Sequence, residues 1–296
     1  MRTAQVLAAL ALSPALAHAV VLVAIDGTAA VMNMGDEFLC VTFDWWPENK
    51  CDYGVCPWEK SGTPFVDLDS PRLRSALAGL GPVTLRIGGT PQDNITYAVG
   101  VDADGACPGY SPAPPALGNN FTGGCLTQER WDLLAGDFCG PSTECRLVFG
   151  VSVLNGRDRY PQMWEYPCPG DWNSSNAKAL IDYSAAQGYA LWGFELGNEV
   201  GCLSAEQYAA DVATLAGLVK GAYGSDPAAL PRIIATDQIG WGPDFFETFV
   251  GLVGGVVDVI TWHEYPLSPG YNNPALDKNI VRPRPNFTAP WLRHHY

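Results

Sequence analysis

The sequence predicts an α/β fold with a parallel sheet that is buried on both faces. The strand candidates are near-continuous apolar runs rather than alternating ones, which is typical of a sheet covered by helices. Longer amphipathic segments lie between them, and strand–helix–strand units imply right-handed crossovers. The chain has 296 residues, 47% apolar and 16% charged, so it can bury a large core. About 250 residues make a complete eight-unit barrel of the TIM type, and we expect a (β/α) barrel of this type.

Six strands are expected along the chain. They are Phe38–Trp45, Val83–Ile87, Arg146–Val153, Tyr189–Leu196, Arg232–Thr236 and Val256–Trp262. Because a TIM barrel has eight strand–helix units, the sequence predicts an incomplete barrel of about six.

Helices are expected between these strands. They are Ser70–Leu80, Thr127–Cys139, Ser174–Gln187, Ser204–Tyr223 and Asp244–Val253. Pro71 suits the first turn of a helix. Ser204 with Gln207 three residues later is a capping-box pattern, and Gly188 is a natural helix stop.

The N-terminus has the pattern of a signal peptide. Arg2 gives a positive start, an apolar stretch runs from Val6 to Leu16, and Ala17-His18-Ala19 is an A-x-A cleavage site. We therefore expect residues 1–19 to be removed and the protein to be secreted, to the extracellular space or cell wall, or delivered to a lysosome or vacuole. No other stretch approaches the ~20 apolar residues of a membrane span, so any membrane association is expected to be peripheral.

The rest of the chain is expected to be one barrel domain, residues 20–266, followed by an irregular tail, residues 267–296. The segment 90–124 is rich in Gly, Pro, Asn and Asp and is expected to be a surface excursion inserted into the barrel. Four N-x-S/T sequons agree with secretion, and glycosylation is expected at Asn94, Asn120, Asn173 and Asn286.

The nine cysteines predict disulfides rather than a metal site. Close pairs in loop-like sequence are Cys51/Cys56, Cys107/Cys125 and Cys139/Cys145. The number is odd, and Cys40, inside a strand-like run, is our candidate for the free thiol. No C-x-x-C motif occurs and only four histidines exist, so zinc is disfavoured. The sequence has no cofactor motif, and we expect neither metal nor cofactor.

The charge of the chain restricts its partners. The formal net charge is −14 and the sequence pI is near 4.5. Nucleic-acid binding requires clustered Lys and Arg, which the chain lacks, so nucleic acid is not expected as a partner. The same charge argues against a heavily sulfated glycan as substrate unless the fold gathers a local basic patch.

Polar and aromatic residues follow the predicted strands, as in a sugar-binding cleft. The strongest signal is Asn198-Glu199 after the fourth strand, where a barrel places catalytic groups. A Glu there can protonate a glycosidic oxygen and then activate water, while the Asn binds the sugar 2-hydroxyl. The structural alternative for Glu199 is a cap or ion pair. Glu195 nominally shares its face by strand alternation, and we expect it to be a buried carboxylate paired with Arg86 or another base.

Several blocks of sequence resemble plant heparanase-like proteins of glycoside hydrolase family 79, in order and spacing from about Gly35 to Tyr265. The blocks are CVTFDWWPENKCDYG (40–54), LRIGGTPQD (85–93), FGVSVLNGR (149–157), DWNSSN (171–176), FELGNE (194–199) and QYAAD (207–211). The resemblance implies a retaining β-glucuronidase mechanism on a (β/α)₈ barrel, usually with an added β-sandwich, acting on glucuronide-containing glycans or conjugates. It implies that Glu199 is the acid/base. It also implies that five residues bind substrate, namely Asp44, Thr90, Asn198, His263 and Tyr265.

A retaining enzyme needs a second carboxylate, which the family places on a seventh strand. After Tyr265 the sequence has no Glu, and its only acidic side chain is Asp277, in sequence without strand character. We therefore expect the nucleophile to be missing from this chain; Glu264 is a weaker candidate to replace it. Three accounts stay open: a truncated form of a longer protein, one fragment of an assembly, or a secreted glycan-binding protein without turnover. A surface or wall glycoprotein that keeps only the scaffold is a further alternative.

Overall fold

The computed structural model describes residues 35, 38–50, 59–105, 107, 109, 111–112, 121–140, 143–157 and 168–264. Every helix and strand belongs to the unit formed by residues 36–296. The expected signal peptide at 1–19, the Cys51/Cys56 pair and the expected tail at 267–296 lie outside the described residues.

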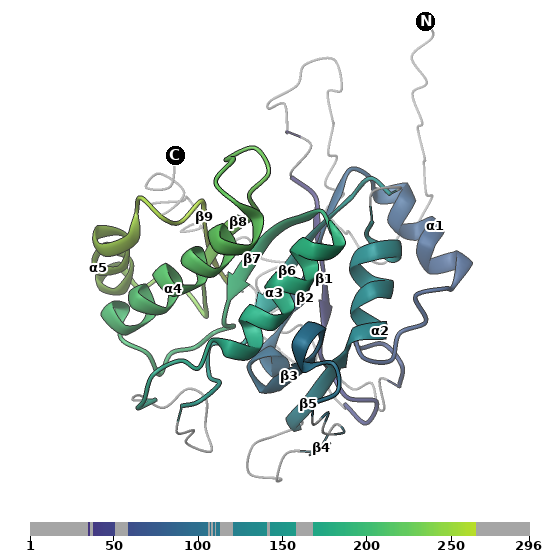
Figure 1. The fold of residues 1–296 in the computed structure, drawn as a ribbon, viewed down its shortest axis with the longest axis horizontal. Helices are drawn as coiled ribbons and strands as arrows, with labels where there is room; N and C mark the ends of the chain where they lie inside the picture. Colours follow the sequence, from purple (N-terminus) through teal and green to yellow (C-terminus); the bar gives the residue numbers. More distant parts are fainter. Residues whose placement is uncertain are drawn as a thin grey trace, which may run out of the picture. The chain divides into compact units, whose positions relative to one another are not determined.

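A six-stranded, all-parallel sheet forms the centre of the fold, in the order β1-β2-β6-β7-β8-β9. Its strands are β1 Cys40–Asp44, β2 Val83–Gly88, β6 Cys145–Val151, β7 Leu191–Leu196, β8 Arg232–Gln238 and β9 Val259–Trp262. The sheet is curled like half of a barrel (Figure 1). Within the described residues, the predicted α/β class and the barrel of about six units are confirmed.

The helices follow one another in the order of the strands (Figure 1). They are α1 Pro71–Leu80, α2 Gln128–Trp131, α3 Ser175–Gln187, α4 Ala205–Tyr223 and α5 Pro243–Val253. The predicted Ser204 cap and Gly188 stop are observed, but the capping box forms only by half, because the Gln207 side chain donates to the carbonyl of Gly170 at 3.0 Å. The Ser204 hydroxyl accepts a hydrogen bond from the Gln207 amide at 3.2 Å, and Gly188 ends α3 in the left-handed conformation, with φ of 71°.

The predicted helix at 127–139 is present but changes its winding. After α2 the chain continues as a π-helix, Asp132–Phe138, rather than as an α-helix. Thr127 caps the segment by accepting a hydrogen bond from the Arg130 amide at 3.3 Å. The wider turns still bury Leu134 and Phe138 in the core.

The last strand is shorter than the prediction Val256–Trp262. The amides of Val256 and Val257 both donate to the carbonyl of Val253, at 2.8 and 3.2 Å, in a turn that continues from α5. The apolar side chains of Val256 and Val257 led to the prediction of a strand. Their amides already donate to the end of α5 and are not available for a sheet, so β9 begins at Val259.

The inserted segment forms a second sheet, of order β3-β5-β4. Its elements are η1 Thr90–Asn94, β3 Ile95–Ala98, η2 Gly100–Asp102, β4 Ser111–Pro112 and β5 Phe121–Thr127. The expectation of a surface excursion does not hold for its first part, because Ile95 and Tyr97 are each only 1% exposed. The Tyr97 hydroxyl accepts a hydrogen bond from the Ser152 amide at 2.8 Å, after the end of β6. Gly and Pro predicted a loop, whereas these two side chains attach it to the core.

Aromatic rings fill the space between the sheet and the first helices. The Phe149 ring centroid lies 4.7 Å from that of Trp131, 5.6 Å from that of Tyr97 and 6.4 Å from that of Trp45. Such edge-to-face contacts add about 0.5–1.5 kcal/mol each to simple burial. This cluster fixes β6 against the inserted segment, and therefore fixes the loops that follow both.

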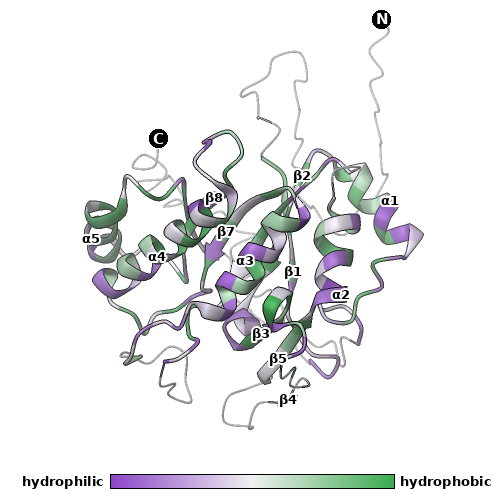
Figure 2. Ribbon diagram, viewed as in Figure 1, coloured by the Kyte–Doolittle hydropathy of each residue, from purple (hydrophilic) through white to green (hydrophobic). Residues whose placement is uncertain are grey.

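Helix α5 is largely hydrophobic along its length, whereas α3 and α4 alternate hydrophilic and hydrophobic patches (Figure 2). Its inner face packs on α4 through Phe249 and Tyr208, whose ring centroids are 5.4 Å apart. None of the helices within the described ranges combines the length and the apolar character needed to cross a bilayer.

Candidate active site

Polar side chains converge at the carboxyl ends of the parallel strands. Asp44 ends β1, Asn198 and Glu199 follow β7, Asp237 lies at the end of β8, and His263 directly follows β9. Barrel enzymes place their catalytic groups at this end of the sheet. The observed cluster therefore occupies the position expected of an active site.

The backbone around Glu199 departs from strand geometry. β7 ends at Leu196, and Glu199 has a φ of 53°, in the left-handed region that non-glycine residues rarely adopt. The Glu199 amide donates to the carbonyl of Asp237 at 2.8 Å, and Asp237 is itself left-handed, with a φ of 52°. Simple strand alternation from Glu195 to Glu199 therefore does not apply, because the strand stops between them. Such backbone strain is frequent at functional sites.

The His263 ring bridges two carboxylates. Its Nδ1 lies 2.5 Å from Glu199 Oε1, and its Nε2 lies 2.7 Å from Asp237 Oδ1. Burial alone lowers the pKa of His263, but the hydrogen bonds to Asp237 and Glu199 outweigh it and raise the pKa to about 10. The ring is therefore an imidazolium at neutral pH, and both nitrogens donate.

Arg86 connects the acidic groups below this ring. Its Nε bonds Glu195 Oε2, and one terminal nitrogen bonds Asp237 Oδ2. The same nitrogen donates to Asn198 Oδ1 at 3.1 Å, and the Thr261 hydroxyl donates to Glu195 Oε1 at 3.0 Å. Burial raises the pKa of Glu195, as does the neighbouring charge of Asp237, while Arg86 and Thr261 oppose the shift. The predicted pairing of Glu195 with Arg86 is thus observed.

Asp44 lies at the edge of this network. Trp46 Nε1 donates to Asp44 Oδ2 at 2.9 Å. Burial raises the pKa of Asp44, against the hydrogen bond from Trp46 and the charges of Arg86 and His263. A Cβ on Gly89, which has a φ of 92°, would lie 2.6 Å from the Asp44 carboxyl carbon, so only glycine fits there. Thr90 follows at once, partly buried, at the start of η1.

Asn198 is 1% exposed, and both its side chain and its backbone are bound. Besides the contact of its side-chain oxygen with Arg86, its amide donates to Asp93 Oδ2 at 2.9 Å. The other oxygen of Asp93 accepts from the Val153 amide at 2.8 Å. Asp93 therefore joins the loop after β6 to the loop after β7.

The structure thus brings together Asp44, Asn198, Glu199 and His263, with Thr90 beside them. Residue reasoning had not assigned roles to Asp237 and Asp93, although both are acidic residues close after predicted strands. Their position after predicted strands could have marked both residues as candidates for the site. It could not show which partner each carboxylate bonds.

Other predicted residues stay untested. Tyr265, Asn120 and Asn286 lie outside the described residues. Asn173 is exposed before α3 and Asn94 is partly buried in η1, so glycosylation stays a prediction. Glu264 is exposed. Within the described chain, no group of three or more His, Cys, Asp or Glu side chains is arranged to hold a metal ion.

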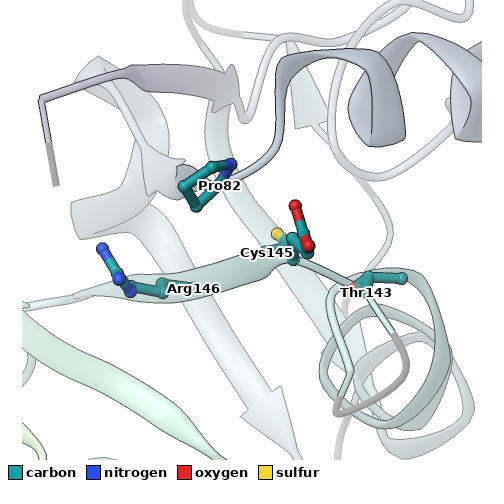
Figure 3. A pocket seen from close by; sticks show the side chains of 5 residues that line it. Pro82, Thr143, Cys145 and Arg146 are labelled. Carbon is teal, nitrogen blue, oxygen red and sulfur yellow. The ribbon is translucent and has the colours of Figure 1, made fainter. Parts of the chain in front are cut away.

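A cavity lies at the opposite end of the sheet. It has a volume of about 480 Å³ and is lined by Pro82, Thr143, Glu144, Cys145 and Arg146 (Figure 3). These residues are at or before the amino ends of β2 and β6. We place the site at the other end because the strained backbone and the ionised network are there, and perturbed ionisable groups gather at functional sites.

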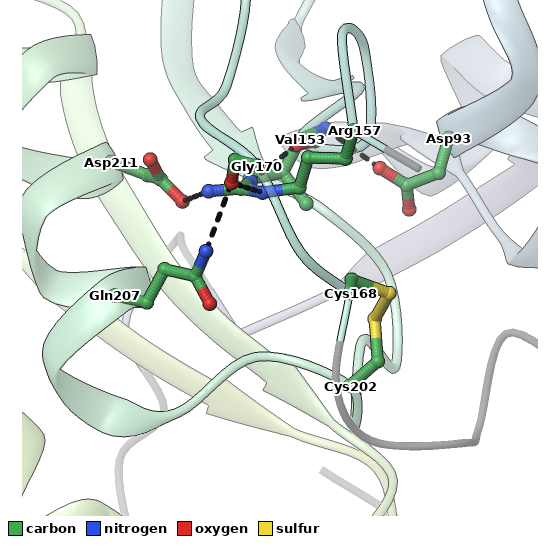
Figure 4. The surroundings of a disulfide bond; sticks show 8 residues. All are labelled: Asp93, Val153, Arg157, Cys168, Gly170, Cys202, Gln207 and Asp211. Carbon is green, nitrogen blue, oxygen red and sulfur yellow. Dashed lines mark hydrogen bonds and ion pairs between the residues drawn. A yellow bond between two sulfur atoms is a disulfide. The ribbon is translucent and has the colours of Figure 1, made fainter. Parts of the chain in front are cut away.

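One disulfide connects two of the loops that carry the network. Cys168–Cys202 joins the loop after β6 to the loop after β7, three residues beyond Glu199 (Figure 4). Beside it, the buried Arg157 bonds Asp211 at 2.7 Å and the carbonyls of Val153 and Gly170 at 2.7 and 3.1 Å. The predicted pairs Cys107–Cys125 and Cys139–Cys145 are also bonded, and Cys40 is free, though exposed.

Removing Cys168–Cys202 with paired serine substitutions is expected to lower the free energy of unfolding by about 2–4 kcal/mol, because the bond restricts the unfolded chain. Replacing Cys139 and Cys145 in the same way is the matched control. Their sequence separation is 6 rather than 34, so the loss is expected to be smaller by about 1.5 kcal/mol. Urea unfolding of both double variants measures the difference, and equal losses would contradict the loop-length argument.

Comparisons with known proteins give a consistent result. Residues 20–287 match the model of glycosyl hydrolase family 79, N-terminal domain. Heparanase-like protein 2 of Arabidopsis thaliana is 32% identical over 267 residues, covering 88% of this chain and 48% of that protein. Baicalin-beta-D-glucuronidase of Scutellaria baicalensis is 33% identical over 266 residues, covering 83% and 49%.

Among solved structures, a 4-O-alpha-L-rhamnosyl-beta-D-glucuronidase from Fusarium oxysporum superposes with a TM-score of 0.47 at 18% identity. That match covers 81% of this chain and 47% of the other. The chain spans about half the length of the curated relatives it matches.

Proposed function

Because the chain belongs to glycosyl hydrolase family 79, we propose that it carries the acid/base half of a retaining β-glucuronidase of the heparanase type. The observation that supports this most is the position of Glu199. It lies at the carboxyl end of β7, next to Asn198 and in contact with an imidazolium from β9. This is the arrangement expected of a carboxyl group that gives and takes a proton in a barrel enzyme.

In the proposed mechanism Glu199 gives its proton to the glycosidic oxygen as the bond to the sugar breaks. In the second step its carboxylate takes a proton from water, which then attacks the anomeric carbon. Asn198 and Asp44 bind sugar hydroxyls, with Thr90 and Tyr265 as further subsite residues. The similarity to the baicalin-beta-D-glucuronidase of Scutellaria baicalensis supports a glucuronide-containing glycan or conjugate as the substrate.

A retaining enzyme also needs a carboxylate nucleophile about 5–5.5 Å from the acid/base. Within the described residues, the acidic groups nearest Glu199 are already engaged. Asp237 and Glu195 bond Arg86, and Asp44 accepts from Trp46. We therefore propose that the nucleophile comes from residues other than these three.

The same observation supports a second candidate, a secreted glycan-binding protein without turnover. A site in which every nearby carboxylate is ion-paired or hydrogen-bonded can still bind sugar hydroxyls through Asp44 and Asn198.

Export from the cell is part of both proposals. The three disulfides among the described residues support it, because such bonds persist in oxidising compartments.

Turnover of aryl and alkyl β-glucuronides tests the first proposal, with product anomers followed by proton NMR. The hydrolase proposal expects release of glucuronic acid with the β-anomer formed first. Calorimetric titration with glucuronic acid tests the second. Saturable binding without release of glucuronic acid would favour the binding protein over the enzyme. If the protein neither binds glucuronic acid nor releases it, both proposals are rejected.

A further inference from the structure

We infer that Asp237 is a positioning residue that holds the His263 ring, charged and correctly oriented, against Glu199. The inference rests on the proposed role of Glu199 as acid/base. Neither the family resemblance nor the motif around Glu199 had assigned Asp237 a role. It follows from four contacts that this residue makes and from the chemistry they allow.

The first contact fixes the ring. Asp237 Oδ1 lies 2.7 Å from Nε2 of His263, while Nδ1 of the same ring lies 2.5 Å from Glu199 Oε1. A ring that meets a carboxylate at each nitrogen can donate at both only if it carries two protons. Asp237 thereby selects the imidazolium and points its other N–H at Glu199.

The remaining contacts fix Asp237 itself. Its Oδ2 bonds Arg86, its amide donates to the Thr261 hydroxyl at 3.1 Å, and its carbonyl accepts from the Glu199 amide at 2.8 Å. Asp237 is 2% exposed, so it cannot turn to solvent. The left-handed backbone that it shares with Glu199 is thus locked by one hydrogen bond between the two residues.

The consequence for the proposed reaction concerns the charge that forms on Glu199. When Glu199 gives its proton to the leaving oxygen, the electron pair of the broken bond stays on that oxygen and Glu199 becomes a carboxylate. An imidazolium already in place donates a hydrogen bond to this carboxylate at the moment it forms. Preorganised donors of this kind need no rearrangement during the reaction.

The charged groups around His263 favour its protonated form. Glu199 after β7 and Asp237 on β8 contact the ring, and Asp44 on β1 interacts with it at longer range. Arg86 on β2 is the opposing cation, but it is neutralised by Glu195 and Asp237. Asp237 and Glu199 therefore raise the pKa of His263 by more than burial lowers it, to about 10.

The test is a nitrogen-15 NMR titration of the histidines in the full chain, which has four. His263 is assigned by its loss in His263→Gln. In the unmodified protein both ring nitrogens are expected to stay protonated through neutral pH. In Asp237→Asn the pKa of His263 is expected to fall by about one to three units. Asn tolerates a left-handed backbone, so this change suits the position.

Asp211→Asn is the matched control. Asp211 is also a buried acid paired with an arginine, Arg157, but it does not contact His263. It is expected to leave the pKa of His263 unchanged. If His263 is neutral at pH 7 in the unmodified protein, or if Asp237→Asn leaves its pKa where it was, the inference is overturned, whatever the activity.

A kinetic readout separates positioning from general damage. Asp237→Asn is expected to lower kcat about tenfold or more on alkyl glucuronides, whose leaving oxygen needs a proton, with KM nearly unchanged. Turnover of nitrophenyl glucuronides, whose leaving oxygen needs little protonation, is expected to fall much less. Equal losses on both substrates would overturn the inference. If even the unmodified protein is inactive, the proposed function fails, and the NMR titration alone decides the role of Asp237.

Discussion

Replacing Glu199 by glutamine is expected to lower turnover of alkyl β-glucuronides by a factor of about 10²–10⁴, which is the usual contribution of general acid–base catalysis. Glutamine keeps the shape of the side chain and can still accept a hydrogen bond from His263, but it has no proton to give to the leaving oxygen. Glu199 is only 8% exposed and contacts the His263 imidazolium. The substitution therefore leaves that cation with one carboxylate partner, Asp237, instead of two. Steady-state kinetics on alkyl and nitrophenyl glucuronides measures the effect.

Glu264→Gln is the matched control for this variant. Glu264 is an exposed residue one position beyond His263, and the substitution makes the same chemical change at the same end of the sheet. Near-normal turnover is expected, and a loss as large as that of Glu199→Gln would instead assign Glu264 the role of second carboxylate. Unchanged turnover in Glu199→Gln would remove Glu199 from the mechanism altogether.

Replacing Arg86 by alanine is expected to lower the free energy of unfolding by about 3–5 kcal/mol, because it leaves buried carboxylates without their cation. Glu195 is 1% exposed and Asp237 is 2% exposed, so neither can recover the lost interaction from water. The substitution also removes the donor to Asn198. Urea unfolding followed by fluorescence, with the slope against urea compared between variants, measures the loss.

Arg74→Ala provides the control on the surface. Arg74 is also paired with two acids, Asp69 and Asp137, but its side chain is 32% exposed against 12% for Arg86. Exposed ion pairs contribute little, so a loss below about 1 kcal/mol is expected. Adding Glu195→Gln to Arg86→Ala should restore part of the stability by removing one uncompensated charge. Similar losses in the two single arginine variants would mean that burial does not set the strength of the Arg86 network.

Much of this architecture could be predicted from the sequence because it depends on local patterns. The apolar runs located the strands, and Ser204 and Gly188 located helix ends. The pairing of Arg86 with Glu195 followed from the cost of an unpaired buried charge. Each of these inferences needs only one residue or one short segment, together with a general rule.

The parts that could not be predicted depend on distant segments meeting. Tyr97 appeared in a segment whose composition indicated a loop, and only its hydrogen bond to Ser152 shows why the segment is buried. The bridge from Asp237 through His263 to Glu199 requires the ends of three strands to be side by side, with two residues in left-handed conformation. No periodicity in the sequence encodes that meeting.

The hydrogen bonds that the Asp93 carboxylate accepts from the Val153 and Asn198 amides have a consequence for engineering this scaffold. One carboxylate holds the Val153 amide and the Asn198 amide, so the inserted segment sets the distance between two loops to which it is not adjacent in sequence. A chimera that takes the loop around Glu199 from a relative therefore has to take Thr90–Asn94 with it. These loops, although separate in sequence, have to be transferred together. Shortening the inserted segment is expected to change the positions of the loops around Glu199 without a substitution at Glu199 itself.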